Sequence, residues 1–210
     1  DKLSASVRNR ILRIYKNTWH MRNLISELLD FRKQEQGYLR LKVEEQNLIT
    51  FTRQAYMSFY EYAQKKEINY RFNHAEELIS VWFDPAQMQK VIFNMLSNAF
   101  KYVPNKGTIT VEVKVVSSRA LVSVSNTGMG IPEDLILKIF APFYQADNSS
   151  SSITSGTGIG LALAKGVVEM HHGKIDVEST AGKEVTFTLS IPLGNRHFSD
   201  EEMSVAEGRE

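Results

Sequence analysis

A glycine-rich turn that runs straight into an apolar helical stretch, at residues 156–165, constrains the fold of this chain most. Its sequence is Gly-Thr-Gly-Ile-Gly-Leu-Ala-Leu-Ala-Lys. Glycines let a backbone approach an anion closely, and the helix that follows directs free N–H groups and its positive dipole end at that anion. A dinucleotide-binding fold would place a strand directly before this turn. The serine-rich residues 149–155 stand there instead, and no Gly-Lys-Ser/Thr sequence occurs, which excludes a Walker A loop.

The composition is that of a globular protein and excludes several function classes. The chain has 210 residues, 42% of them hydrophobic, and its 25 basic and 24 acidic residues give a net charge of +1. Such a balance does not favour a nucleic-acid or membrane-surface partner. No apolar run reaches the roughly 20 residues of a membrane span. The absence of cysteine excludes disulfides, thiol catalysis and cysteine-ligated zinc. Because the first residue is not Met, we expect an excised piece of a longer protein. The absence of cysteine favours the cytoplasm for this part.

The first 36 residues are predicted to form one long helix that stops at Gly37. Its apolar residues alternate steps of four and three, as in a coiled coil. They are Val7, Ile11, Ile14, Thr18, Met21, Ile25 and Leu28. Such a seam requires a partner helix, either in a second copy of the chain or in a segment that the sequence lacks. We therefore expect a helical region at 1–38, a globular domain at 39–193 and a polar, frayed tail at 194–210.

The globular region mixes helical and strand patterns, and its last strands form hairpins. This predicts an α+β two-layer sandwich, with one mixed, mostly antiparallel sheet and helices on a single face. The expected helices cover 47–65, 85–102, 131–140 and 158–172. The expected strands cover 68–72, 79–83, 108–116, 120–126, 174–179 and 184–191, with a mobile loop at 144–156.

Two motifs before the glycine-rich turn carry polar side chains that suit a nucleotide. Asn94, Asn98 and Lys101 share one face of the predicted helix 85–102, where an amide oxygen suits Mg²⁺ and a lysine suits a phosphate. Tyr102 could lie against a flat base. The alternative is an ordinary solvated helix face.

The second motif is the turn at 126–130, which follows a predicted strand. The Asn126 amide can both donate to and accept from an adenine edge. The alternative is a simple β-turn before a helix.

The order and spacing of these motifs resemble the ATP-binding catalytic domain of sensor histidine kinases, in the superfamily shared with type II topoisomerases, Hsp90 and MutL. The resemblance covers residues 39–193. It rests on an asparagine box at 94–102, a first glycine box at 126–130, a phenylalanine box at 140–143, a second glycine box at 156–161 and a closing strand at 182–191. It implies the Bergerat (GHKL) ATP-binding fold and transfer of the γ-phosphoryl group of Mg-ATP to a histidine.

The resemblance also implies which residues form the site. Asn94, Asn98 and Lys101 would be catalytic, and Asn98 would hold Mg²⁺. The nucleotide would contact Asn94, Asn98, Lys101, Tyr102, Asn126, Gly128, Gly130, Ile131, Phe143, Gly156, Thr157, Gly158, Ile159, Gly160, Leu161 and Thr186. Relatives usually carry aspartate where this chain has Asn126, so we expect the bond to adenine to be weaker by about 1 kcal/mol.

Residues 14–37 resemble the second helix of the kinase dimerisation domain, in the style of large hybrid sensor kinases. This implies a homodimer of the complete protein, whose other parts could be anchored in the inner membrane, and two partners besides ATP: a phosphoacceptor histidine helix and a response-regulator receiver domain. No nucleic-acid partner is expected. The family's acceptor histidine, followed by an acidic residue and Thr-Pro, is not found in the sequence. His20, His171 and His172 are interpreted as structural or surface residues.

Two other functions remain open on the sequence. A GHKL-type ATPase or chaperone module would carry a glutamate at the position of Asn94 to activate water, which an amide cannot do. A degenerate domain that docks a partner without catalysis would explain Asn126.

Overall fold

The computed structural model describes residues 5–145 and 157–203, and the chain divides into two units after Leu39. The first unit contains helix α1, Ala5–Glu35, which is about 46 Å long at 1.5 Å per residue. It ends where Gly37 adopts a φ of +69° and the Tyr38 N–H donates to the Lys33 carbonyl at 2.8 Å. The predicted long helix and its stop are therefore confirmed over the described residues. No helix in this described part of the chain is both long and apolar enough to cross a bilayer.

The second unit is built on a five-stranded sheet with the order β2-β4-β5-β7-β6. Strand β2 pairs in parallel with β4, and all other neighbours are antiparallel. The strands are β2 (Asn69–His74), β4 (Thr108–Val116), β5 (Arg119–Thr127), β6 (Lys174–Thr180) and β7 (Glu184–Pro192). The prediction of a mixed, mostly antiparallel sheet is confirmed.

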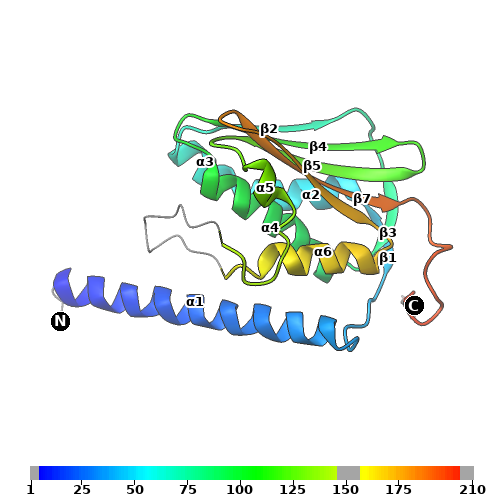
Figure 1. Cartoon of the computed structure of the whole chain (residues 1–210), viewed down its shortest axis with the longest axis horizontal. Helices are drawn as coiled ribbons and strands as arrows, with labels where there is room; N and C mark the ends of the chain where they lie inside the picture. The colour runs from blue at the N-terminus through cyan, green and yellow to red at the C-terminus, as the bar shows by residue number, and fades with distance from the viewer. Residues whose placement is uncertain (1–4, 146–156, 204–210) are drawn as a thin grey trace, which may run out of the picture. The chain divides into compact units, whose positions relative to one another are not determined.

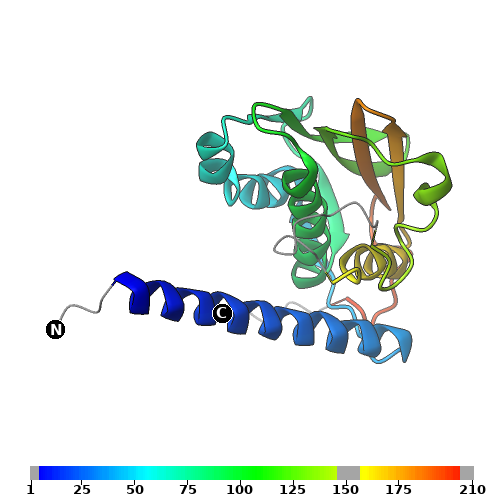
Figure 2. The same cartoon turned by 60° about the vertical axis from the view of Figure 1, so that its left-hand side comes forward.

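Helices cover one face of this sheet. Helix α4 (Pro85–Tyr102) packs on β5, helix α6 (Gly160–Met170) packs on β6, and α4 and α6 contact each other (Figure 1, Figure 2). Alternate strand residues point into this layer because side chains alternate along a strand. The buried set includes Val111, Val113, Val122, Val124, Phe187 and Leu189.

Three details of the predicted elements are wrong. The helix expected at 47–65 is two helices, α2 (Leu48–Met57) and α3 (Tyr60–Lys65), because the chain turns at Ser58 and the Phe59 ring stacks on Phe100 at 5.0 Å. Helix α5 covers only Glu133–Ile136. A separate two-stranded sheet joins β3 to a strand that the sequence pattern did not reveal. These strands are β1 (Glu44–Asn47) and β3 (Ser80–Phe83).

The prediction of a frayed tail is wrong for residues 194–203. The Val43 N–H donates to the Glu202 carbonyl at 2.8 Å, and Val43 and Met203 form a parallel bridge. Phe198 is 7% exposed and forms a small core with Leu41 and Val43. One buried aromatic side chain therefore anchors a segment whose composition is mainly polar.

Candidate functional site

Helix α4 begins with a well-formed cap. The Asp84 carboxylate accepts the Gln87 N–H at 3.0 Å, and Pro85 occupies the first turn, where its missing N–H costs nothing. Its buried face is Met88, Val91, Ile92, Met95, Leu96, Ala99 and Phe100. Asn94, Asn98 and Lys101 are half-buried, whereas Ser97 on the outer side is exposed. These three polar side chains thus lie at the border of the buried face, which a fully solvated helix face would not produce.

The middle of α4 meets the start of α6 at a glycine. A Cβ on Gly160 would overlap the side-chain oxygen of Asn94. Glycine is therefore the residue that lets the first turn of α6 approach the asparagine. The first N–H groups of α6 have no intrahelical acceptor, and no side chain caps this helix end. The arrangement places an amide side chain beside a helix N-terminus, which suits an anion.

The end of α4 meets the turn at 126–130. A Cβ on Gly128 would lie 2.9 Å from the Tyr102 carbonyl oxygen. The β6–β7 turn holds the other side: the Gly128 N–H donates to the Lys183 carbonyl at 3.0 Å, and the Gly182 N–H donates to the Met129 carbonyl at 2.7 Å. This supporting role of the β6–β7 turn is not readable from the sequence, because the paired groups belong to the backbone.

Asn126 ends the buried face of β5 and is 4% exposed. Its amide nitrogen donates to the Thr127 carbonyl at 3.1 Å, the one hydrogen bond of this side chain among the described residues. Since a carbonyl can only accept, this contact assigns the NH₂ group to Thr127 and leaves the side-chain oxygen as an acceptor. The asparagine therefore presents the same kind of group that an aspartate would.

Phe143 and Gly158 meet through their backbones. The Phe143 N–H donates to the Gly158 carbonyl at 2.9 Å, and φ is +63° at Phe143 and +72° at Gly158. The Phe143 side chain is exposed, whereas Phe140 packs edge-on against Phe187 at 6.4 Å. The two aromatic residues thus differ: the half-buried Phe140 packs its ring against the sheet, and Phe143 contributes backbone.

Replacing Gly158 with alanine is expected to destabilise the protein more than the left-handed backbone alone would explain. A Cβ there would lie 2.8 Å from the Phe143 carbonyl carbon, which is rigid backbone. Gly182→Ala is the matched control, because Gly182 has a φ of +71° with nothing within 4 Å of its Cβ position. We expect the positive φ to lower the free energy of unfolding by about 1–2 kcal/mol in both variants, and the close contact to lower it further in Gly158→Ala alone. Urea unfolding measures both losses. Equal losses would contradict the close contact.

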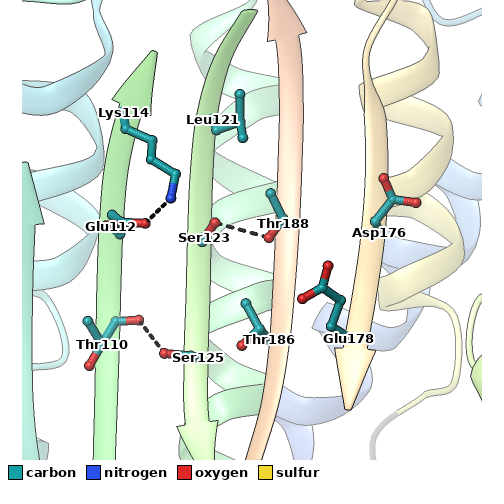
Figure 3. Close-up of a pocket in the computed structure, with 10 residues that line it drawn as sticks. All are labelled: Thr110, Glu112, Lys114, Leu121, Ser123, Ser125, Asp176, Glu178, Thr186 and Thr188. Carbon is teal, nitrogen blue, oxygen red and sulfur yellow. Dashed lines mark hydrogen bonds and ion pairs between the residues drawn. The ribbon is translucent and has the colours of Figure 1, made fainter. Parts of the chain in front are cut away.

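Thr186 was wrongly included in the predicted site. Strand β7 pairs Thr186 with Ser125 and Val185 with Asn126, so Thr186 lies on the opposite face of the sheet from Asn126. A groove of about 480 Å³ runs along that open face (Figure 3). It is lined by Thr110, Glu112, Lys114, Leu121, Ser123, Ser125, Asp176, Glu178, Thr186 and Thr188. This groove is therefore separated by the sheet from the glycine turns and α4.

The other predicted residues that the structure describes make contacts of their own. Gly130 adopts a φ of +76° with its Cβ position 2.8 Å from the Thr180 carbonyl oxygen, and the Ile131 N–H donates to the Ser179 hydroxyl at 2.7 Å. The Thr157 hydroxyl accepts the Ile159 N–H at 3.0 Å, one residue before Gly160 and Leu161 begin α6. Gly156 and most of the predicted loop at 144–156 lie outside the described residues. The described residues contain no cluster of three or more His, Cys, Asp or Glu that could hold a metal.

Comparison with known proteins identifies similar chains. Residues 83–195 match the family model described as histidine kinase-, DNA gyrase B- and HSP90-like ATPase. The chain is 33% identical over 205 residues to histidine kinase P4 of Formosa agariphila, covering 96% of this chain and 15% of that protein. It is 35% identical over 194 residues to the circadian input-output histidine kinase CikA of Synechococcus elongatus, covering 90% of this chain and 26% of that protein. The chain thus spans about a quarter or less of these relatives.

Solved structures share the fold. Histidine kinase ThkA, crystallised with the response regulator TrrA, superposes with a TM-score of 0.73 at 27% identity, covering 92% of this chain and 53% of that one. Full-length ShkA in complex with AMPPNP gives a TM-score of 0.80 at 22% identity, covering 92% of this chain and 40% of that one, a likeness of fold alone. The α+β sandwich predicted from the sequence is confirmed by these superpositions.

Proposed function

Because the chain belongs to the family of histidine kinase-, DNA gyrase B- and HSP90-like ATPases, as an ATP-dependent histidine kinase catalytic domain, we propose that it transfers the γ-phosphoryl group of Mg-ATP to a histidine of a dimerisation helix. The bond from the γ-phosphorus to the bridging oxygen breaks, a bond to a histidine nitrogen forms, and ADP leaves. The observation that carries this proposal is the set of three backbone approaches, Gly160 at Asn94, Gly128 at Tyr102 and Gly158 at Phe143. They join four sequence motifs around one end of the α4–α6 pair.

Each described residue has a defined task in this proposal. The Asn126 oxygen accepts from the adenine amino group, and Tyr102, which is 54% exposed, lies beside the base. The first turn of α6 and Lys101 bind the phosphates through N–H groups and charge. Asn98 would hold Mg²⁺, whose chemistry fits because Mg²⁺ prefers oxygen ligands, retains waters and takes its other ligands from phosphates. When bound there, the ion would supply positive charge against the charge that develops on the transferred group.

Asn94 favours phosphoryl transfer over hydrolysis. Its oxygen lies against Gly160 at the start of α6, and an amide cannot remove a proton from water. A neutral histidine ring attacks through the lone pair of its unprotonated nitrogen, and the proton on the other nitrogen passes to solvent. Positioning and charge neutralisation therefore carry the transfer. An ATPase or chaperone module, the second candidate, would require a carboxylate there.

The direct test measures transfer and hydrolysis side by side. We would incubate the chain with Mg-ATP labelled at the γ-phosphate and a separate two-helix domain that carries an acceptor histidine, taken from one of the similar kinases. We expect acid-labile label on the acceptor and none when its histidine is alanine. Phosphate release without labelled acceptor would favour the ATPase. Calorimetry that detects no AMP-PNP binding at millimolar concentration, with and without Mg²⁺, would favour a docking domain.

Asn126→Ala is expected to weaken ATP binding about 2- to 10-fold, because one hydrogen bond to the adenine amino group is lost. Inosine triphosphate lacks this amino group, so its affinity should not change. Calorimetry with both nucleotides measures the difference. Ser125→Ala is the matched control, since Ser125 faces the groove on the other side of the sheet. A variant that binds both nucleotides as the parent does would refute the role of Asn126.

The wider assignments extend the same proposal. The apolar stripe of α1 includes Ile14, Met21 and Ile25, exposed by 65%, 61% and 57% in the single chain, and a homodimer would cover it. A response-regulator receiver domain would accept the phosphoryl group from the histidine, as the ThkA complex with TrrA suggests by analogy. Because ATP is the substrate, this part of the protein would work in the cytoplasm. No nucleic acid is proposed as a partner.

A further inference from the structure

His171 is a fully buried polar residue far from the motifs that bind nucleotide. It is 0% exposed and follows α6 directly. Its Nε2 atom accepts the backbone N–H of Asp84 at 2.9 Å, and its Nδ1 atom lies 2.7 Å from the Val167 carbonyl oxygen. Only the neutral ring with its proton on Nδ1 satisfies both contacts, since a carbonyl accepts and an amide donates. Burial lowers the pKa of His171, which favours this neutral form.

The bond to Asp84 joins two helices that carry the site. Asp84 caps the start of α4, and His171 ends α6, so the bond ties the beginning of one helix to the end of the other. Asn94 lies ten residues along α4 and Gly160 lies eleven residues back along α6, distances of about 15 Å and 17 Å at 1.5 Å per residue. The two antiparallel helices thus meet at two places, His171 with Asp84 and Gly160 with Asn94.

The two contacts differ in how they fix the axial position of α4 relative to α6. The contact at Gly160 has no side chain on one partner, and the apolar packing between α4 and α6 is non-directional. Apolar packing therefore selects an axial register by shape alone, without a bond between two particular atoms. A hydrogen bond has a preferred length and angle, and an unpaired buried N–H is costly, so the His171 bond resists sliding of the two helices along each other.

We propose that His171 is a positioning residue that sets the axial register of α4 against α6, and through it the placement of Asn94 and Asn98 relative to the first turn of α6. The inference rests on the proposed nucleotide site. Asp84 also accepts the Lys42 N–H at 2.9 Å, so the same cap holds the segment that begins the second unit.

Two substitutions of similar size distinguish the roles of the two ring nitrogens of His171. In His171→Gln the side-chain oxygen can reach the place of Nε2 and accept from Asp84. In His171→Asn the amide can reach only the place of Nδ1 and bond Val167. We expect His171→Asn to raise the Kd for AMP-PNP about fivefold or more, and His171→Gln to stay within about twofold of the parent. Hydrogen exchange of the Asp84 amide should be fast in the first variant and slow in the second.

Equal Kd values for the two variants, with the Asp84 amide exposed in only one, would overturn the proposal. A general loss of stability would not produce the expected difference in Kd, because both variants lose part of the packing of the imidazole ring.

A measurement on the unaltered protein covers the case in which a variant fails to fold. Acidification protonates Nε2 and removes the acceptor for Asp84, so the amide resonances of Asp84 and Gly160 should titrate with the midpoint of the His171 ring. The other ionisable groups beside this ring are Asp84, His172 and Glu202, so the resonances of the His171 ring itself define its midpoint. Titration of the ring without movement at Gly160 would refute the coupling. This measurement needs no nucleotide, so it separates failure of the register role from failure of the proposed function.

Discussion

Asn98→Ala is expected to lower the rate of phosphoryl transfer by about 100-fold or more while leaving the fold intact. Asn98 is half-buried on the α4 border, and its amide oxygen is the proposed protein ligand of Mg²⁺. Without it, the charge that develops on the transferred group loses a preorganised partner. The measurement is the initial rate of acceptor labelling at saturating ATP, together with the midpoint of urea unfolding.

Ser97→Ala is the matched control for Asn98. Ser97 is the preceding residue on the same helix and is exposed, so its substitution changes helix composition without touching the border. Asn98→Asp should recover part of the rate, because a carboxylate oxygen also binds Mg²⁺. A labelling rate in Asn98→Ala equal to that of Ser97→Ala would remove Asn98 from the catalytic site.

Phe198→Ala is expected to destabilise the second unit by about 3 kcal/mol or more, even though Phe198 lies beyond the last strand. Its ring is 7% exposed, packs 4.3 Å from the His197 ring and closes the core of Leu41 and Val43. Loss of the ring leaves a cavity and frees the backbone pairing of Val43. Urea unfolding measures the loss, with Arg196→Ala as an exposed control expected within about 0.5 kcal/mol. Matching values for the two variants would show that the tail does not pack.

The elements that the sequence predicted well are those with local causes. Helix α4 begins at Pro85 and ends at Tyr102, as Asp84-Pro85 and its spacing of apolar residues indicated. Strands β4 and β5 flank the turn expected near Ser117, where φ is +55°. The glycine turn at 126–130 and the described residues 157–160 of the second turn were identified from the order of their residues. Each signal lies within one turn of helix or one strand, so no distant residue is needed to interpret it.

The predictions that failed depended on partners far along the chain. Thr186 lies on the open face of the sheet because Asn126 pairs with Val185. This register depends on two strands, so the sequence of one strand does not reveal it. The break at Phe59 follows from its stacking on Phe100, and the order of the tail follows from the contact of Phe198 with residues near Val43.

The residues alone were enough to predict the family and the α+β sandwich, because these depend on side-chain chemistry at short spacing. The fold was needed to show that Asn126 presents its oxygen, that Thr186 faces away from the site and that His171 holds Asp84 from 87 residues away. Such contacts form when helices and strands pack, and the free energy that selects them comes from burial and hydrogen bonding between segments that no local pattern connects.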